Sequence, residues 1–313
     1  PDFIVILGDT LDTHEVVNIQ PHNLACSMID GLRKIAPVYL IIGNHDLINH
    51  KQYLTDQHIF NPLKQWDNVT VVDKPIVENI KGEVFTFCPY VENGKFGYAL
   101  EQTYSQEHFW DESLCIFAHQ EFKGCKMGAK ISEDGDEWEV TYPMVVSGHI
   151  HSYQVLCNIY YPGSAIQHAF GESHNKRVWL IDFGKYVSEC KDNTKLEDYV
   201  EKIDLDMPKK VILRFDSVKK AISYNLDKLP SNSHFKVHIK DTSANFESFR
   251  RSDAYKNFQG VGVKFSYDTV LTKLEETPPS QKETFMDLLE KECKKDPEKS
   301  KIFDKHITPL ISD

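Results

Sequence analysis

The sequence contains no apolar run of the roughly 18 residues that a membrane-spanning helix needs. Its cysteines form no C-x-x-C pair and are scattered along the chain, at Cys26, Cys88, Cys115, Cys125, Cys157, Cys190 and Cys293. An odd number of scattered cysteines favours free thiols in a reducing, intracellular compartment. Positive charge is also scarce, since 36 lysines and arginines stand against 47 acidic residues, a net charge of −11. This balance excludes binding of nucleic acid through bulk charge, but not through a local basic track.

The 313 residues, 41% hydrophobic and 27% charged, have the composition of an ordinary globular protein, and the length suggests about two domains. In the first part of the chain, short apolar runs typical of strands alternate with helical spacing, as at Leu24, Met28, Leu32 and Ile35. The runs cover residues 3–7, 38–42, 69–72, 84–87, 114–117 and 144–146. This alternation predicts an α/β domain whose strands are covered by helices.

The pattern changes near residue 205. The segment 209–215 reads as a strand, and Phe235, Val237 and Ile239 alternate with polar residues, as in a half-solvated strand. We therefore expect a small α+β cap lobe over residues 205–275, after a first domain over residues 1–204.

Residues 280–313 predict a pair of short amphipathic helices. Ser280 and Glu283 have the spacing of a capping box, and Asp296-Pro297 can begin a second helix. The apolar stripes consist of Phe285, Leu288, Leu289, Ile302, Phe303 and Ile307. These stripes either pack on the protein's own domain or bind a partner.

Four polar clusters stand out because each directly follows a strand-like run. They are Gly8–Asp12, Gly43–Asp46, Ala118–Gln120 and Gly148–His151. Ligands gather at the carboxyl ends of strands in an open α/β sheet, so we expect the clusters to meet at one rim. Together they supply a carboxylate, an amide and four imidazoles, a set suited to manganese, iron or zinc. The alternative is that these residues have no shared function and are capping or solvated side chains.

In this order the clusters resemble the motifs of the calcineurin-like metallophosphoesterases, over about residues 3–183. The resemblance implies a β-sandwich flanked by helices that holds two divalent metal ions, with manganese the best fit. It implies that Asp9 bridges the two metals and that His151 binds the first. By the same resemblance, Asn44, His119 and His149 bind the second.

The family also gives His45 a role of its own: it faces the scissile phosphate and helps the leaving oxygen depart, with Asp46 holding it in orientation. The family's opening D-x-H motif lies on an earlier strand, whereas seven residues precede Gly8 here. We expect these two ligands upstream of Pro1; the other possibility is a protein that holds at most one metal well.

Two features indicate which branch of this family the sequence resembles. Phosphoprotein phosphatases carry phosphate-gripping arginines at positions that hold Thr13 and Ile42 here. Conversely, the segments 161–164 and 170–172 are similar to the Y-P-G-S and F-G-E stretches of the SbcD nucleases. That family includes the meiotic-recombination nuclease of eukaryotes and the recombination nuclease subunit of T-even phages, and the phage branch is the more similar.

This resemblance implies a metal-dependent exonuclease and endonuclease in DNA repair and recombination, a homodimer whose tail binds an SbcC-type SMC-like ATPase. It would act in the host cytoplasm if phage-encoded and in the nucleus if eukaryotic. The candidate DNA contacts are Lys123, Lys126, Lys130, Arg250 and Arg251. A phosphodiesterase or phosphatase for a small phosphoester, and a degenerate scaffold that only recruits partners, are the alternatives.

Overall fold

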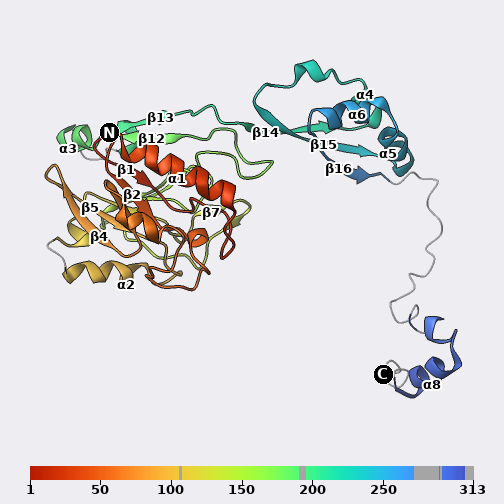
Figure 1. The fold of residues 1–313 in the computed structure, drawn as a ribbon, viewed down its shortest axis with the longest axis horizontal. Helices are drawn as coiled ribbons and strands as arrows, with labels where there is room; N and C mark the ends of the chain where they lie inside the picture. Colours follow the sequence, from red (N-terminus) through yellow and green to blue (C-terminus); the bar gives the residue numbers. More distant parts are fainter. Residues whose placement is uncertain (106–107, 190–194, 271–288, 290, 307–313) are drawn as a thin grey trace. The chain divides into compact units, whose positions relative to one another are not determined.

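The computed structural model describes residues 1–105, 108–189, 195–270, 289 and 291–306. The chain divides into two compact units, labelled by element in Figure 1. Unit 1 comprises Pro1–Ile212 and Pro230–Phe235, and unit 2 comprises Leu213–Leu229 and Lys236–Asp313. We expected the first domain to end at residue 204, and the junction falls at Ile212, inside a strand.

Unit 1 contains two sheets that share a core. The first is parallel, in the order β1-β2-β3, and consists of Ile4–Ile6, Val38–Ile41 and Val69–Val72. The second has the order β10-β11-β9-β6-β5-β4 and consists of Gln154–Leu156, Ile159–Tyr161, Met144–Ser147, Cys115–Ala118, Glu83–Cys88 and Ile76–Ile80. Its four central strands are parallel and its two edge strands antiparallel. Each of the six runs expected to form a strand forms one.

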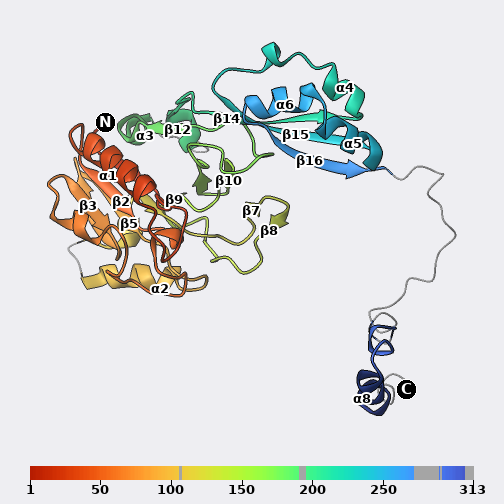
Figure 2. The same cartoon turned by 45° about the vertical axis from the view of Figure 1, so that its right-hand side comes forward.

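The core of unit 1 lies between these sheets. Tyr39 of β2 stacks on Phe87 of β5 with ring centroids 4.0 Å apart. Because side chains alternate along a strand, the next residue, Leu40, faces the opposite way, in the core cluster that includes α1 (Ile19–Arg33). On the outer face of the second sheet, the core includes α2 (Phe96–Glu101). Figures 1 and 2 both show α1 and α2 on opposite sides of the strands, which confirms the predicted sandwich flanked by helices.

Helix α1 is present as predicted, but the apolar stripe that predicted it does not face the core. Its buried residues are Ala25 and Ile29. Leu24 and Met28 are 64% and 47% exposed, and Ile35, just beyond the helix, is 67% exposed. The periodicity therefore identified the helix correctly, while most of the stripe lies on the solvent side.

The remaining elements of unit 1 are short. They are the hairpin strands β7 (Lys126–Met127) and β8 (Lys130–Ile131), the antiparallel pair β12 (Val178–Ile181) and β13 (Val200–Ile203), and α3 (Phe183–Glu189). Single turns of 3-10 helix cover Asn44–Asp46, Asn61–Gln65, Gln102–Ser105, Trp110–Glu112 and Leu196–Tyr199.

Unit 2 is built on one three-stranded sheet with helices against it. The sheet has the order β14-β15-β16, from Lys209–Phe215, Ser233–Asp241 and Lys264–Thr269. The helices are α4 (Val218–Ile222), α5 (Ser243–Arg250) and α6 (Asp253–Gly260), with a 3-10 turn at Leu226–Lys228. Phe235, Val237 and Ile239 are buried, which confirms the alternation predicted for β15.

In the tail, the start signal at Asp296-Pro297 is confirmed, because α8 spans Pro297–His306. Phe285, Leu288 and Ile307 lie outside the described residues. Within the described ranges no helix is long and apolar enough to cross a membrane. The cysteines in those ranges, all except Cys190, are free thiols as expected.

Candidate metal centre

The four polar clusters meet at the carboxyl ends of strands from both sheets. Asp9 follows β1 and Asn44 follows β2 in the first sheet. His119 follows β6 and His149 follows β9 in the second. The centre therefore lies where the two sheets of the sandwich come together.

Nε2 of His119 lies at the middle of a cluster of four candidate ligand atoms. This nitrogen is 3.1 Å from Oδ2 of Asp9, 3.1 Å from Oδ1 of Asn44 and 3.3 Å from Nδ1 of His149. Nδ1 of His149 is in turn 2.9 Å from Oδ1 of Asn44. One carboxylate oxygen, one amide oxygen and two imidazole nitrogens thus converge, and the ligand atoms of Asp9, His119 and His149 all lie within 4.8 Å of one another.

The backbone fixes which nitrogen His119 offers. Its Nδ1–H donates to the carbonyl oxygen of Leu7 at 2.6 Å, so Nε2 is left with its lone pair toward the cluster. A hydrogen bond of this kind sets the tautomer of a metal-binding histidine. Asp9 and His149 are both left-handed, with φ of +49° and +71°, an uncommon backbone state that gathers at functional sites.

Two of the glycines before the clusters are needed for close approach. A Cβ on Gly8 would overlap the ring of His119, and Gly8 also has φ of +89°. A Cβ on Gly43 would overlap Asp9, although its φ is ordinary. Side chains at these positions would push the first ligand away from the other three.

The protonation of the cluster suits cation binding. Burial alone would raise the pKa of Asp9, but the neighbouring His119 and the backbone N–H of His45 outweigh it and hold that pKa well below its usual range. Burial lowers the pKa of His149 to about 3, and His119 adds to the effect. For His119 burial acts downward, but the charge of Asp9 prevails and raises its pKa, so a metal ion would have to displace any proton on Nε2. Asp9 is therefore charged and His149 neutral at neutral pH, as ligands must be.

The donor set fits a divalent transition metal. Asp9, Asn44, His119 and His149 supply mixed oxygen and nitrogen ligands, which suit manganese, iron or zinc better than magnesium. A second set of ligands is less complete. His151 lies outside the 4.8 Å group, its Nδ1 is 3.5 Å from Oε1 of Glu172, and its ring stacks on that of His168.

His45 sits beside the cluster with contacts of its own. Its Nδ1–H donates to the carbonyl oxygen of Asp12 at 2.7 Å, which leaves Nε2 for a substrate. We expected Asp46 to hold this ring, but its two carboxylate oxygens accept the backbone N–H groups of Gly43 and Leu11. Burial raises the pKa of Asp46 to about 7, although the hydrogen bond from Gly43 acts against the rise. Asp46 thus organises the loop, and Asp12 contacts the ring through its backbone.

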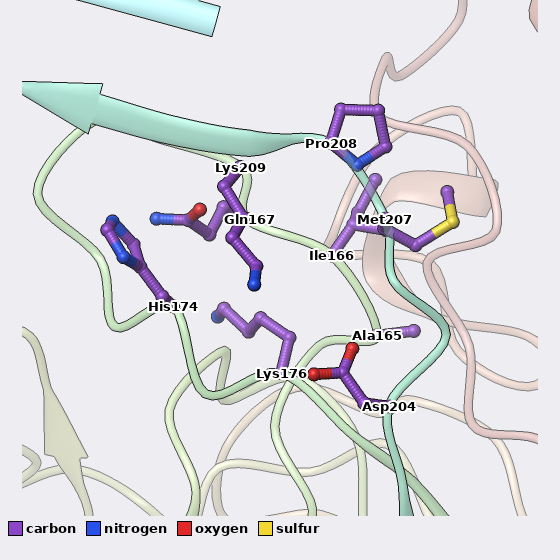
Figure 3. A pocket seen from close by; sticks show the side chains of 9 residues that line it. All are labelled: Ala165, Ile166, Gln167, His174, Lys176, Asp204, Met207, Pro208 and Lys209. Carbon is purple, nitrogen blue, oxygen red and sulfur yellow. The ribbon is translucent and has the colours of Figure 1, made fainter. Parts of the chain in front are cut away.

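Behind His151, a buried lysine ties the loop together. Lys176 donates to the carbonyl oxygen of His151 at 2.7 Å and to Oγ of Ser164 at 2.8 Å, and pairs with Glu172 at 3.0 Å. Figure 3 shows Lys176 beside Gln167 and other polar side chains that line a small cavity. At about 10 Å³ this cavity has room for one water, so it is no substrate site.

The candidate DNA contacts fall in different environments. Lys123 is exposed and pairs with Glu137 at 2.5 Å. Lys126 and Lys130 are exposed on the β7–β8 hairpin. Arg250 lies over the ring of Tyr267 at 5.3 Å. Arg251, which follows α5, is exposed.

The described tail residues also differ in exposure. Leu289 is half-buried, Ile302 is 62% exposed and Phe303 is buried.

Sequence reasoning left out two histidines that the structure brings to the site. His14 stacks on His45 at 4.6 Å, and His168 stacks on His151 at 4.3 Å. His14 lies two residues after the second aspartate of its cluster, and His168 lies between two segments already singled out. That proximity was the one signal available, since neither histidine belongs to a motif.

Comparisons with known proteins agree with this geometry. A model of the calcineurin-like phosphoesterase family matches residues 1–153. "Putative phosphoesterase 244L" of Invertebrate iridescent virus 6 is 41% identical over 256 residues, 80% of this chain and 86% of that protein. "Putative phosphoesterase 078R" of Invertebrate iridescent virus 3 is 39% identical over 268 residues, 85% of this chain and 74% of that protein. "Exonuclease subunit 1" of Enterobacteria phage T4 is 25% identical over 179 residues, 56% of this chain and 51% of that protein.

Proposed function

The chain belongs to the calcineurin-like phosphoesterase family, and from that premise we propose that it is a metal-dependent DNA nuclease. Hydrolysis of phosphoesters at a metal centre is the family's activity. The finer proposal is that the substrate is a DNA phosphodiester, cut both from ends and within single strands, in an SbcCD-type repair or recombination complex. The 25% identity with a phage protein named as an exonuclease subunit supports it.

The observation that carries the preference for diesters is the lack of a clamp for a terminal phosphate. Ile42 takes one of the two arginine positions of the phosphatases and is buried in the core. Both arginines of unit 1 are engaged elsewhere: Arg33 pairs with Asp30 at 2.7 Å and Arg177 with Asp204 at 2.9 Å. The doubly charged end of a phosphomonoester would thus lack its bidentate partner.

The described side chains divide the chemistry between binding and proton transfer. Asp9, Asn44, His119 and His149 would hold the metal, which when bound supplies an activated water and offsets charge on the phosphate. His45, with Nδ1–H fixed on a carbonyl oxygen, would give a proton from Nε2 to the leaving oxygen. We propose manganese as the metal, and that Asp9 and His151 would help to hold a second ion.

An open, basic sheet face in unit 2 supports a nucleic-acid substrate. Phe265 and Tyr267 of β16 pack against phenylalanines of α5 and α6, so the residues between and beside them face the other way. In the parallel register Lys236 lies beside Lys264. Four cations on this face have no ion pair among the described residues: Arg214, Lys236, Lys240 and Lys264. The face also carries one ion pair, between His238 and Asp268 at 3.2 Å. On a chain of net charge −11, such a face suits a polyanion.

Two partner proposals remain from the sequence. The exposed stripe of α1, with Leu24 and Met28, supports a homodimer, because such a patch favours a protein contact. An exposed apolar side chain in the tail, Ile302 of α8, supports binding of an SbcC-type ATPase.

The test of the proposed function compares two substrates in the same manganese buffer. We expect the purified chain to cleave a short single-stranded DNA far faster than it releases phosphate from a phosphoserine peptide. Comparable rates on both would support instead the second candidate, a hydrolase of small phosphoesters. That candidate is favoured by the names of the two viral relatives, which say phosphoesterase and nothing of DNA.

A further inference from the structure

Two neighbouring loops at the metal centre exchange histidine hydrogen bonds. His45, from the loop after β2, donates Nδ1–H to the carbonyl oxygen of Asp12 in the loop after β1, at 2.7 Å. His14, two residues beyond Asp12, donates Nδ1–H in the opposite direction, to the carbonyl oxygen of Leu47 at 3.3 Å. Each loop thus places a histidine ring against the backbone of the other loop, and each ring uses its Nδ1–H in that hydrogen bond.

The two rings also lie against each other. Their centroids are 4.6 Å apart and their planes differ by 21°, a stacked arrangement. Stacked rings at this distance stabilise one another beyond the area they bury. Both residues are only half-buried, so this contact covers a face of His45 that would otherwise meet water.

Two hydrogen bonds from backbone N–H groups to carboxylate side chains also connect these two loops. The N–H of His45 donates to Oδ1 of Asp9 at 2.8 Å, and the N–H of Leu11 donates to Oδ1 of Asp46 at 3.2 Å. The backbones of the two loops are therefore tied firmly, while the imidazole of His45 depends on one bond and on its contact with His14. A ring held by one hydrogen bond can rock about it, and a second ring against its face limits that motion.

We propose that His14 is a positioning residue for His45: it fixes the ring plane and thereby keeps the Nδ1–H bond to the carbonyl oxygen of Asp12 formed, which sets the tautomer and the direction of Nε2. This inference rests on the proposed role of His45 as the acid for the leaving oxygen. In that step water forms a new P–O bond as the P–O bond to the leaving group breaks. The doubly protonated ring of His45 gives the proton on Nε2 to the departing oxygen and so returns to the neutral Nδ1–H tautomer. His14 touches neither group and acts through the His45 ring alone.

The experiment uses aryl phosphodiesters, so that its result does not depend on DNA cleavage. Bis(p-nitrophenyl) phosphate has a leaving group that departs readily without a proton, whereas diphenyl phosphate needs one. For His14→Ala we expect kcat on diphenyl phosphate to fall about tenfold, kcat on the nitrophenyl ester to change little, and KM to stay the same, since misplacing a catalytic group costs up to about 10²-fold. His14→Phe, which keeps a ring against His45, should recover most of the rate.

A measurement without activity completes the test. In metal-free protein labelled with ¹⁵N-histidine, His45 is identified by the signals lost in His45→Asn. We expect its Nδ1–H tautomer in the parent and in His14→Phe, and a tautomer mixture in His14→Ala. The matched control is His50→Ala, which removes an exposed imidazole shortly after the same loop and should change neither readout.

Equal losses on both esters, or an unchanged His45 tautomer in His14→Ala, would overturn the proposal. If His45→Asn itself slowed both esters equally, the acid role of His45 would fail instead, and the tautomer comparison would still decide whether His14 positions the ring.

Discussion

His45 directly follows the proposed ligand Asn44 in the chain, yet their contacts are separate. Asn44 directs Oδ1 to His119 and His149, whereas His45 hydrogen-bonds to Asp12 and stacks on His14. We therefore expect His45→Asn to lower the rate of DNA cleavage by about 10²–10⁴-fold, the usual contribution of a general acid, and to leave manganese affinity unchanged. Calorimetric titration of manganese beside a cleavage assay measures both.

Asn44→Ala is the matched comparison for that variant, because it changes the adjacent residue. It should lose manganese affinity and cleavage together, since Asn44 lies 2.9 Å from one histidine ligand and 3.1 Å from the other. A parallel loss of manganese in His45→Asn would mean that His45 is itself a ligand.

At this scale the sequence predicts which side chains come together better than it predicts their backbone partners. Asp9, Asn44, His119 and His149 were predicted together from their places after strands, and the structure brings them together. The carbonyl groups of Leu7 and Asp12, which orient His119 and His45, were not predicted. Every residue has a carbonyl group, so only the fold reveals which one a ring meets.

The open sheet face of unit 2 leads to a prediction at the level of elements. Changing Lys236 and Lys264 to glutamate removes two adjacent cations from β15 and β16. We expect weaker DNA binding and a plot of log affinity against log salt whose slope is smaller by about 2, since each phosphate contact contributes about 0.9. Hydrolysis of bis(p-nitrophenyl) phosphate should be unaffected.

Lys219 and Lys256 to glutamate form the control for that face, because they change two exposed lysines on the helices α4 and α6. DNA affinity that falls equally in both double variants would point to net charge rather than to the sheet face.

Helix α1 shows the limit of periodicity. The stripe with Leu24 and Met28 predicted a helix correctly, but a stripe does not say which neighbour covers it, and here the residues that enter the core are Ala25 and Ile29. If the exposed stripe is a dimer contact, Leu24→Arg with Met28→Arg should convert a dimer to a monomer. Sedimentation of the parent as a monomer would contradict this.

Other elements differ in how far they could be predicted. The alternation in β15 and the proline start of α8 were clear local signals, and both elements are present. Strands of three residues such as β10 and β11 are too short to show a period, so the pairing of β10 with β11 and of β11 with β9 could not be predicted from the sequence.

For the whole molecule, the sandwich explains why residues up to 140 positions apart form one centre. Asp9 belongs to a loop of the first sheet and His149 to a loop of the second, and the stack of Tyr39 on Phe87 holds the two sheets together beneath them. The core thus sets the spacing of the ligands, and the loops set their orientation.

The most direct measurement of the central claim is manganese-dependent cleavage of a short, end-labelled single-stranded DNA, by the parent chain and by His149→Ala. The control is His174→Ala, which changes an exposed histidine outside the ligand cluster. We expect cleavage by the parent and by the control, none after chelation of the metal, and none by His149→Ala, which should also bind less manganese. Cleavage that persists in the chelator, or in His149→Ala at the parent's rate, would contradict it.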